Sequence, residues 1–415
     1  MRRALGVAIV CEGVDFQAGM ERQALRLAKG LAERGVRVVV VTTYSPPGFG
    51  LPLPSRPPRR EHRDGYEIVR VPMLRWWSGE AVRALFALAL ARVLVSRRVD
   101  VVYSVQWQAA VHVDKVVAVG RWPTVMKIAC GGEYGDLAQV SRRKESSEIL
   151  ERLGRVDRYA CLSRQVEEEI ERAGLPRERV FSVRNGVDRS RFSPEGPKAT
   201  LPAGKWVLFL GRHDSQKRLD VLLRAFALIK VPEARLALAG QGPDLAKLEA
   251  LARELGISAR VSFLGERRDV PELLRAASVF VLPSAAEGLP NALLEALSTG
   301  VPSVVTDIPG TNEVVSPERE ALMVPLDDAP ALARALERAL TDEALRERLV
   351  KAGHERIARE FDMDAVTDAH LRLFMSMKSE TQPVNRRRLV GLSFELAKAL
   401  LVGWFYALGR RLFRT

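Results

Sequence analysis

The chain contains few of the residues that form disulfide frameworks and metal centres. It has three cysteines and five histidines among 415 residues, and Cys11, Cys130 and Cys161 lie far apart in the sequence. An odd, scattered set of cysteines neither forms a disulfide framework nor has the spacing of a zinc site. We therefore expect a reducing, cytoplasmic environment and no catalytic metal.

The amino-terminal apolar run is also too short for a secretory signal. The chain opens with Met-Arg-Arg shortly before the apolar segment 5–10, and the acidic residues Glu12 and Asp15 follow that segment at once. A signal peptide needs a longer apolar core and a small-residue cleavage site. The pattern instead predicts a buried first strand.

Positive charge is plentiful, but it is unevenly distributed. The net charge is +13, and residues 377–415 hold eight Lys or Arg against two Glu, which leaves +6 in the tail. The remainder of the chain is only modestly basic and carries no recognised nucleic-acid motif. We therefore expect the charge to serve a partner of the tail, with nucleic acid as a distant alternative.

The tail combines that charge with an apolar segment. Residues 389–408 are mostly apolar, and arginines flank them at 386–388 and 410–411. Twenty such residues are long enough to span a bilayer, but Glu395 and Lys398 would be costly at its centre. The pattern favours an interfacial helix on an anionic membrane, formed by residues 386–414. A helix packed on the protein body and a membrane span remain the alternatives.

The rest of the chain is built from two similar halves. Residues 5–42 show a strand, a glycine-containing loop, a helix and a second strand, and residues 206–240 repeat that order. Continuous apolar strands that alternate with helices are typical of parallel sheets covered on both faces. The pattern predicts two Rossmann-like, doubly wound domains, joined near the Pro- and Gly-rich residues 184–204. A proline-rich segment, 45–60, predicts a long surface loop.

The most informative element lies in the second half. The apolar run 277–282 predicts a buried strand, and the Gly and Pro residues after it lead into a predicted helix over 291–298. Glu287 therefore lies in a loop at the carboxyl end of a strand, and Glu295 lies inside the helix. Two carboxylates repel phosphate but accept hydrogen bonds from paired hydroxyls, as on a sugar ring and a ribose. This arrangement suits a nucleotide-sugar site.

At this point the chain resembles the retaining glycosyltransferases of family 4, which have the GT-B fold. Six landmarks occur in the family's order across residues 1–376, and the second half matches best. They are Gly19-Met20-Glu21, Asn185-Gly186-Val187-Asp188, Gly211-Arg212 with Lys217, Gly240-Gln241-Gly242-Pro243, Glu287 with Glu295, and Phe361-Asp362-Met363-Asp364.

The resemblance implies a division of the chain into four parts. Residues 1–190 would form the acceptor-side domain, and residues 191–360 the nucleotide-sugar donor domain. Residues 361–376 would form a helix that crosses back to the first domain. Residues 377–415 would be the basic, apolar tail.

The resemblance also implies roles for individual residues. Arg212 and Lys217 would clamp the donor diphosphate, Glu295 would bind the ribose, and Glu287 would lie beside the transferred sugar. Arg212, Lys217 and Glu287 would thus be the catalytic groups, with no metal or other cofactor. The donor-binding set would be completed by Gly19, Gly240, Gly242, Gly288, Leu289, Pro290 and Asn291.

One departure from the family pattern concerns the first half. Cys130 stands where the family usually carries a histidine beside the donor sugar, and a thiol cannot replace an imidazole as a two-sided hydrogen-bond partner. Glu133 and Asp136 are candidate acceptor contacts together with Cys130. His112 could substitute for the missing histidine, although a lone histidine is more often structural. His213 is either a phosphate contact or an ordinary loop residue.

The expected activity is transfer of a sugar from a nucleoside-diphosphate-sugar to a glycan or glycolipid acceptor. The enzyme would be cytoplasmic, with the tail on the inner face of the cell membrane. A sugar-nucleotide epimerase and a glycan phosphorylase on the same fold are the alternatives within enzymes. A basic nucleic-acid-binding protein is the alternative from another class.

Overall fold

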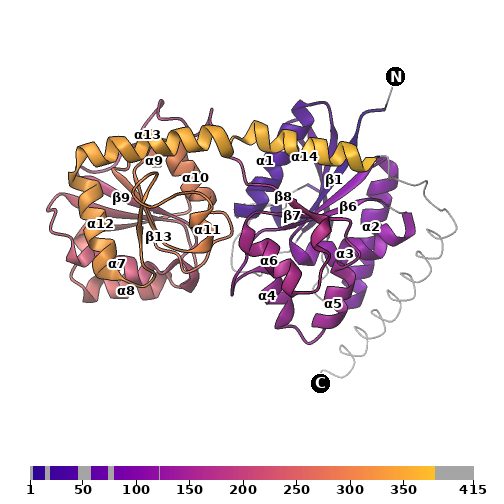
Figure 1. The fold of residues 1–415 in the computed structure, drawn as a ribbon, viewed down its shortest axis with the longest axis horizontal. Helices are drawn as coiled ribbons and strands as arrows, with labels where there is room; N and C mark the ends of the chain where they lie inside the picture. The colour runs from indigo at the N-terminus through magenta and orange to yellow at the C-terminus, as the bar shows by residue number, and fades with distance from the viewer. Residues whose placement is uncertain (1–2, 15–18, 45–57, 73–78, 121, 379–415) are drawn as a thin grey trace. The chain divides into compact units, whose positions relative to one another are not determined.

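The computed structural model describes residues 3–14, 19–44, 58–72, 79–120 and 122–378 (Figure 1). Its chain forms two compact units. The first contains residues 1–129, 136–183 and 367 onward, and the second contains residues 130–135 and 184–366. The first unit is therefore discontinuous in sequence.

The first unit has an eight-stranded sheet in the order β3-β4-β2-β1-β5-β6-β7-β8. Its strands pair in parallel, except that the edge strand β3 is antiparallel to β4. The strands are β1 (Gly6–Glu12), β2 (Arg37–Tyr44), β3 (Arg60–Arg63), β4 (Tyr66–Pro72), β5 (Val101–Val105), β6 (Thr124–Ile128), β7 (Arg158–Cys161) and β8 (Val180–Ser182).

Helices cover both faces of this sheet because its central strands are apolar on both sides. Val101 to Val105 and Thr124 to Ile128, for example, are buried throughout. The helices are α1 (Gly19–Glu33), α2 (Gly79–Ser96), α3 (Gln106–Gly120), α4 (Asp136–Ser141), α5 (Ser146–Leu153) and α6 (Arg164–Arg172), followed much later in the chain by α14 (Met363–Lys378).

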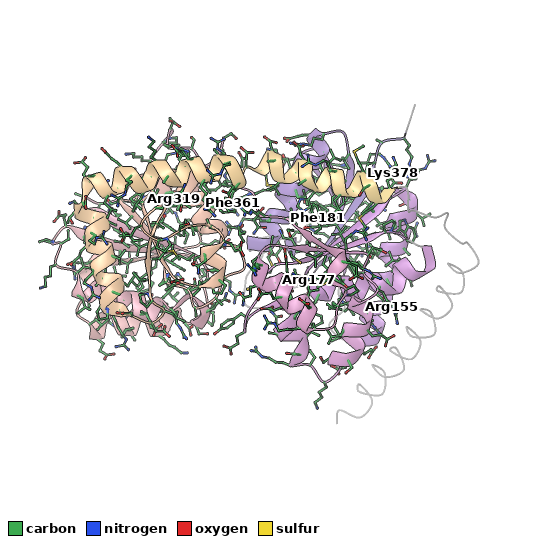
Figure 2. All side chains as sticks on the ribbon, viewed as in Figure 1. Arg155, Arg177, Phe181, Arg319, Phe361 and Lys378 are labelled. Atoms are coloured by element: carbon green, nitrogen blue, oxygen red, sulfur yellow. The ribbon has the colours of Figure 1, made fainter. Side chains whose placement is uncertain are left out.

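Helix α14 packs onto the first unit through a close approach at a glycine and through contacts between aromatic rings. Gly30 of α1 lies so close to Thr367 that an added Cβ would stand 2.7 Å from the threonine Oγ1. His370 and Phe374 contact the ring of Tyr103 on β5, with centroids 5.6 Å away in each case. At the far end, Lys378 Nζ donates a hydrogen bond of 2.7 Å to the carbonyl of Arg3 (Figure 2). Helix α14, the last helix within the described residues, therefore belongs to the core of the first unit.

The second unit has a six-stranded, all-parallel sheet in the order β11-β10-β9-β12-β13-β14. Figure 1 shows α7 and α12 side by side over this sheet, and they pack against each other. The strands are β9 (Lys205–Leu210), β10 (Ala234–Ala239), β11 (Val261–Gly265), β12 (Val279–Leu282), β13 (Ser303–Thr306) and β14 (Leu322–Val324). The helices are α7 (Leu219–Leu228), α8 (Leu245–Glu254), α9 (Val270–Ala276), α10 (Asn291–Ser298), α11 (Pro309–Asn312), α12 (Ala329–Thr341) and α13 (Glu343–Glu360).

Two of the sequence landmarks lie side by side in the second unit. Val187 donates its N–H to the carbonyl of Phe361, and Met363 donates its N–H to the carbonyl of Val187. Gly186 allows this approach, because a Cβ there would stand 2.7 Å from Met363 Cα. The Arg184 guanidinium stacks over the ring of Phe361, which follows the end of α13, with Cζ 5.0 Å from the ring centroid (Figure 2). The two segments therefore form one connection at the start of α14.

The expected fold class, two doubly wound α/β domains with a helical extension, is confirmed. Contacts divide the chain after Val183 and after Val366. The predicted bounds at 190 and 360 remain predictions. The tail from residue 379 and most of the proline-rich loop, 45–57, lie outside the described residues, and none of the helices within the described ranges is long and apolar enough to cross a membrane.

Candidate active site

The loops after β9 and β12 lie at the point where the strand order of the second sheet reverses. The chain runs from β9 outward to β10 and β11 on one side, and β12 begins the run to β13 and β14 on the other. Ligands of open α/β sheets bind at such a switch point, outside the carboxyl ends of the strands. The two loops, residues 211–218 and 283–290, hold Arg212, Lys217 and Glu287. Topology therefore brings these predicted residues to one edge of the sheet.

A lysine and a glutamate join the two loops directly. Lys217 Nζ lies 2.7 Å from Glu287 Oε1, and their side chains are only 17% and 11% exposed. The Ser284 hydroxyl donates a second bond of 2.7 Å to the same oxygen. Glu287 Oε1 thus accepts two hydrogen bonds, one of them from a cation, in a partly desolvated setting. This arrangement orients both charged groups before any ligand binds.

Three further residues hold the Glu287 loop in place, and sequence reasoning did not assign them a site role. The Gln216 side chain donates from Nε2 to the carbonyl of Ala286 at 2.7 Å, and the Gln216 backbone carbonyl accepts the N–H of Ala285 at 2.8 Å. Asn185 donates from Nδ2 to the carbonyl of Leu289 and to Asn291 Oδ1. The side-chain bonds among these span 70 to 106 positions along the chain, so no local pattern signals them.

The third such residue is Gly310, at the start of α11. A Cβ on Gly310 would stand 2.3 Å from the carbonyl oxygen of Glu287. Real Cβ atoms do not approach an oxygen so closely, so only glycine allows this backbone contact. Gly310 follows β13, and therefore three successive strand ends of the sheet position Glu287.

The predicted glycines Gly240 and Gly242 let the loops after β9 and β10 close against each other. A Cβ on Gly240 would stand 1.9 Å from the carbonyl oxygen of Gly211, and one on Gly242 would stand 2.2 Å from that of His213. Gly240 also has a φ of +137°, which disfavours other residues. His213 exchanges backbone bonds with Gln241 and Asp244 across the same junction. The Gly-x-Gly-Pro turn thus packs on the loop that carries Arg212.

His213 is fully buried under this junction. Its ring lies between those of Phe209 and Phe263, with both centroid distances 6.3 Å. Neither ring nitrogen has a hydrogen-bond partner among the described residues. Burial lowers the pKa of His213, and the neighbouring Asp214 carboxylate opposes this only in part. His213 is thus a loop residue, as one of its two predicted roles has it, but a fully buried one, and no ring nitrogen is accessible to a phosphate.

Arg212 and Glu295 differ strongly in exposure. The Arg212 side chain is 69% exposed, with Nε 3.2 Å from Asp214 Oδ2, so its guanidinium is accessible to a ligand. Glu295 is only 5% exposed, and four of its neighbours on α10, Leu293, Leu294, Ala296 and Leu297, are buried apolar side chains. Glu295 therefore lies inside a helix, as predicted, and in apolar surroundings. Helix α10 begins at Asn291, directly after the buried residues Gly288, Leu289 and Pro290.

The residues predicted for the first half are more dispersed. Gly19 is the first residue of α1. Asp136 is buried at the start of α4, where its Oδ2 accepts the N–H of Ala129 at 2.9 Å. Cys130 is partly exposed, with Sγ 3.3 Å from the carbonyl of Gly131, and Glu133 is exposed. Asp136 therefore stabilises the turn after β6.

Comparison with known proteins agrees with this geometry. The family described as glycosyl transferases group 1 matches residues 197–356, and the glycosyl transferase 4-like domain matches residues 18–186. The lipopolysaccharide core biosynthesis glycosyltransferase LpsE of Rhizobium meliloti is 34% identical over 245 residues, which are 59% of this chain and 71% of LpsE. LpsD of the same organism is 33% identical over 239 residues, 57% of this chain and 68% of LpsD.

Solved structures share the fold over almost the whole chain. Sucrose-phosphate synthase from Thermosynechococcus elongatus has a TM-score of 0.77 at 22% identity, covering 91% of this chain and all of that one. Anabaena HepE in complex with UDP and glucose has a TM-score of 0.74 at 17% identity, covering 90% of this chain and 100% of HepE. At these identities the likeness shows the fold alone, whereas LpsE and LpsD show the family. The chain belongs to the GT-B glycosyltransferases of family 4 type, enzymes that transfer a sugar from a nucleotide-sugar donor.

Proposed function

We propose that the protein binds a nucleoside-diphosphate-sugar on the second unit and transfers the sugar, with retention of configuration, to a hydroxyl of a glycan or glycolipid. The observation that carries this proposal is the Lys217–Glu287 pair across the switch point of the second sheet. The pair supplies a cation for a phosphate and a carboxylate for sugar hydroxyls at one place. Retention rests on the resemblance to family 4.

The chemistry follows from the charges at the site. As the glycosidic bond breaks, negative charge grows on the leaving diphosphate, and Lys217 and the accessible Arg212 would stabilise it. Glu287 would accept hydrogen bonds from the transferred sugar, and Glu295 those from the ribose diol. Gly240 and Gly242 would allow the backbone to approach the donor. We propose that these cations replace a metal, so that chelation with EDTA leaves turnover unchanged.

The nature of the relatives supports an acceptor in surface-glycan synthesis. LpsE and LpsD are named for lipopolysaccharide core biosynthesis, and HepE was solved with UDP and glucose. The direct test is to incubate the protein with UDP-, GDP- and ADP-sugars and to measure release of nucleoside diphosphate. The anomeric configuration of a transferred product, read by NMR, tests retention. No release from any donor, or an inverted product, would contradict the respective part of the proposal.

From the sequence of the tail we also propose that the enzyme is cytoplasmic and binds an anionic membrane surface through residues 386–414. Each Lys or Arg near such a surface contributes about 1 kcal/mol. Full-length protein should therefore sediment with phosphatidylserine vesicles at low salt, and a truncation after Lys378 should not. Binding of nucleoside diphosphate should survive the truncation, because every proposed donor residue precedes it. Equal sedimentation of both proteins would refute the membrane role.

A further inference from the structure

The first unit has a switch point of its own. In its sheet β1 leads outward to β2 and β4 on one side, and β5 begins the run to β6, β7 and β8 on the other. The carboxyl ends of β1 and β5 therefore meet where an open α/β sheet binds ligands. Glu12 is the last residue of β1, and α3 starts directly after β5 at Gln106. Of the donor-binding residues named above, Gly19 follows β1 at this edge, as the first residue of α1, and the others lie in the second unit.

An acid–base pair spans this switch point, as Lys217 and Glu287 span the other. His112 of α3 places Nε2 at 3.5 Å from Glu12 Oε1. The imidazole is 17% exposed, whereas the carboxylate is 45% exposed. The separation is longer than a normal hydrogen bond, which leaves the carboxylate able to accept bonds from a ligand. Contacts of this kind often tighten only when substrate binds.

The ring of His112 is held in place from its buried side. It packs on Phe86 of α2, with ring centroids 5.3 Å apart. Its Nδ1 is buried and has no hydrogen-bond partner among the described residues. Burying a lone pair without a partner costs less than burying an unpaired N–H donor, which favours the tautomer with the proton on Nε2. His112 therefore presents an N–H toward Glu12 and the solvent edge.

Two glutamines lie in the first turn of α3, which begins at the carboxyl end of β5. Gln108 has a buried Oε1 with no hydrogen-bond partner within the described part of the chain. Gln106 has a φ of +70°, which is uncommon for a residue with a side chain. Strained backbone of this kind tends to occur at functional sites. The edge thus holds an exposed carboxylate, an imidazole N–H and an amide oxygen without a partner.

We propose that Glu12 and His112 bind the hydroxyl groups of the sugar acceptor. The inference rests on the proposed function, which places the donor on the second unit and leaves the acceptor to another site. A carboxylate accepts hydrogen bonds from one or two neighbouring hydroxyls, and the imidazole donates to an oxygen beside them. A neutral, hydroxyl-rich ligand fits this set, and an anionic one does not, because Glu12 would repel it.

The test uses the full-length protein with ¹³C-labelled histidine. The chain has five histidines, and the His112→Gln variant identifies the signal of His112. The probes are methyl α-D-glucopyranoside, methyl α-D-galactopyranoside and methyl α-D-mannopyranoside, each titrated with and without UDP. We expect at least one glycoside to shift the His112 ring signal saturably while His354, on α13 of the second unit, stays unchanged.

The near-isosteric Glu12→Gln variant should bind that glycoside with an affinity lower by about tenfold or more, because a hydrogen bond to a charged group contributes about 1.5–3 kcal/mol. Glu33→Gln is the matched control, since Glu33 is an exposed carboxylate 3.8 Å from Lys29 on α1. Absence of a saturable His112 shift with all three glycosides would overturn the inference. Equal affinity of the Glu12→Gln and Glu33→Gln variants would overturn it as well. UDP binding, measured by calorimetry, tests the donor site separately and should be the same in all variants.

Discussion

Replacing Lys217 by alanine isolates the group that joins the two loops of the second unit. The substitution removes the cation 2.7 Å from Glu287 and leaves that carboxylate with the hydrogen bond from the Ser284 hydroxyl. Both side chains are less than one-fifth exposed, so water cannot fully replace the lost ammonium. The change should therefore affect both stability and catalysis.

The two effects differ in size. Removing one member of a fully buried ion pair costs about 3–5 kcal/mol, and an exposed pair contributes about 0–1 kcal/mol. For this intermediate burial we expect a loss of about 1–3 kcal/mol in the free energy of unfolding. Loss of an electrostatic group that stabilises a transition state lowers turnover about 10²–10³-fold, or about 2.7–4 kcal/mol. The Glu287→Gln variant should restore part of the stability to Lys217→Ala, but none of the activity.

The control is Lys205→Ala. Lys205 forms a comparable ion pair with Glu233 at 3.2 Å, with side chains 39% and 49% exposed. It lies at the start of β9, at the opposite end of the strand from the Lys217 loop. Urea unfolding and donor turnover would be measured for wild type, both single variants and the Lys217→Ala/Glu287→Gln double variant. Near wild-type turnover of Lys217→Ala, or a Lys205→Ala variant that loses as much activity, would refute the reasoning.

Three further outcomes are expected. Glu295→Gln should weaken UDP binding in calorimetry, whereas Glu287→Gln should chiefly lower turnover, because UDP has a ribose but no transferred sugar. Equal UDP binding by wild type and Glu295→Gln would contradict the ribose role. Gly240→Ala should lower the free energy of unfolding in urea by ~2 kcal/mol or more and should lose donor binding, because its Cβ would overlap the Gly211 carbonyl. The control is Gly256→Ala, where φ is +70° and the space around the Cβ is open. That variant should lower the free energy of unfolding by only about 1–2 kcal/mol. Burial lowers the pKa of His213 in the folded protein, so on acidification the imidazole is protonated first in the unfolded chain. The contribution of the neutral His213 to stability is therefore fully present above about pH 6.5 and falls as the pH drops below it. The His213→Leu variant should flatten the dependence of the unfolding free energy on pH between about 5 and 7.

Local signals were sufficient to predict much of the fold. The predicted helix 291–298 coincides with α10, because a proline precedes it and a glycine follows it, and both residues act within a few positions. The apolar run 277–282, predicted as a buried strand, contains β12, which is buried throughout. Apolar runs flanked by glycine need no tertiary information to be recognised.

The supports of the candidate site could not be predicted in this way. Ser284, Gln216 and Gly310 act on the Glu287 loop only because β9, β12 and β13 are neighbours in the sheet. Strand order is a property of the whole domain, and no window of sequence contains it. His213 shows the same limit, because its position beside Arg212 does not reveal that its ring is fully buried. The aromatic rings that enclose it come from β9 and β11.

The discontinuity of the first unit has a consequence for the order in which the protein is made. A ribosome releases residues 184–366, the larger part of the second unit, before it releases α14, which supplies His370 and Phe374 to Tyr103. Domains generally fold as units during synthesis, from the amino terminus onward. Here that order is reversed, because the unit begun first is completed last. Until residue 378 has left the exit tunnel, Tyr103 on β5 and Gly30 on α1 have no helix to pack against, and this nascent face is available to a chaperone.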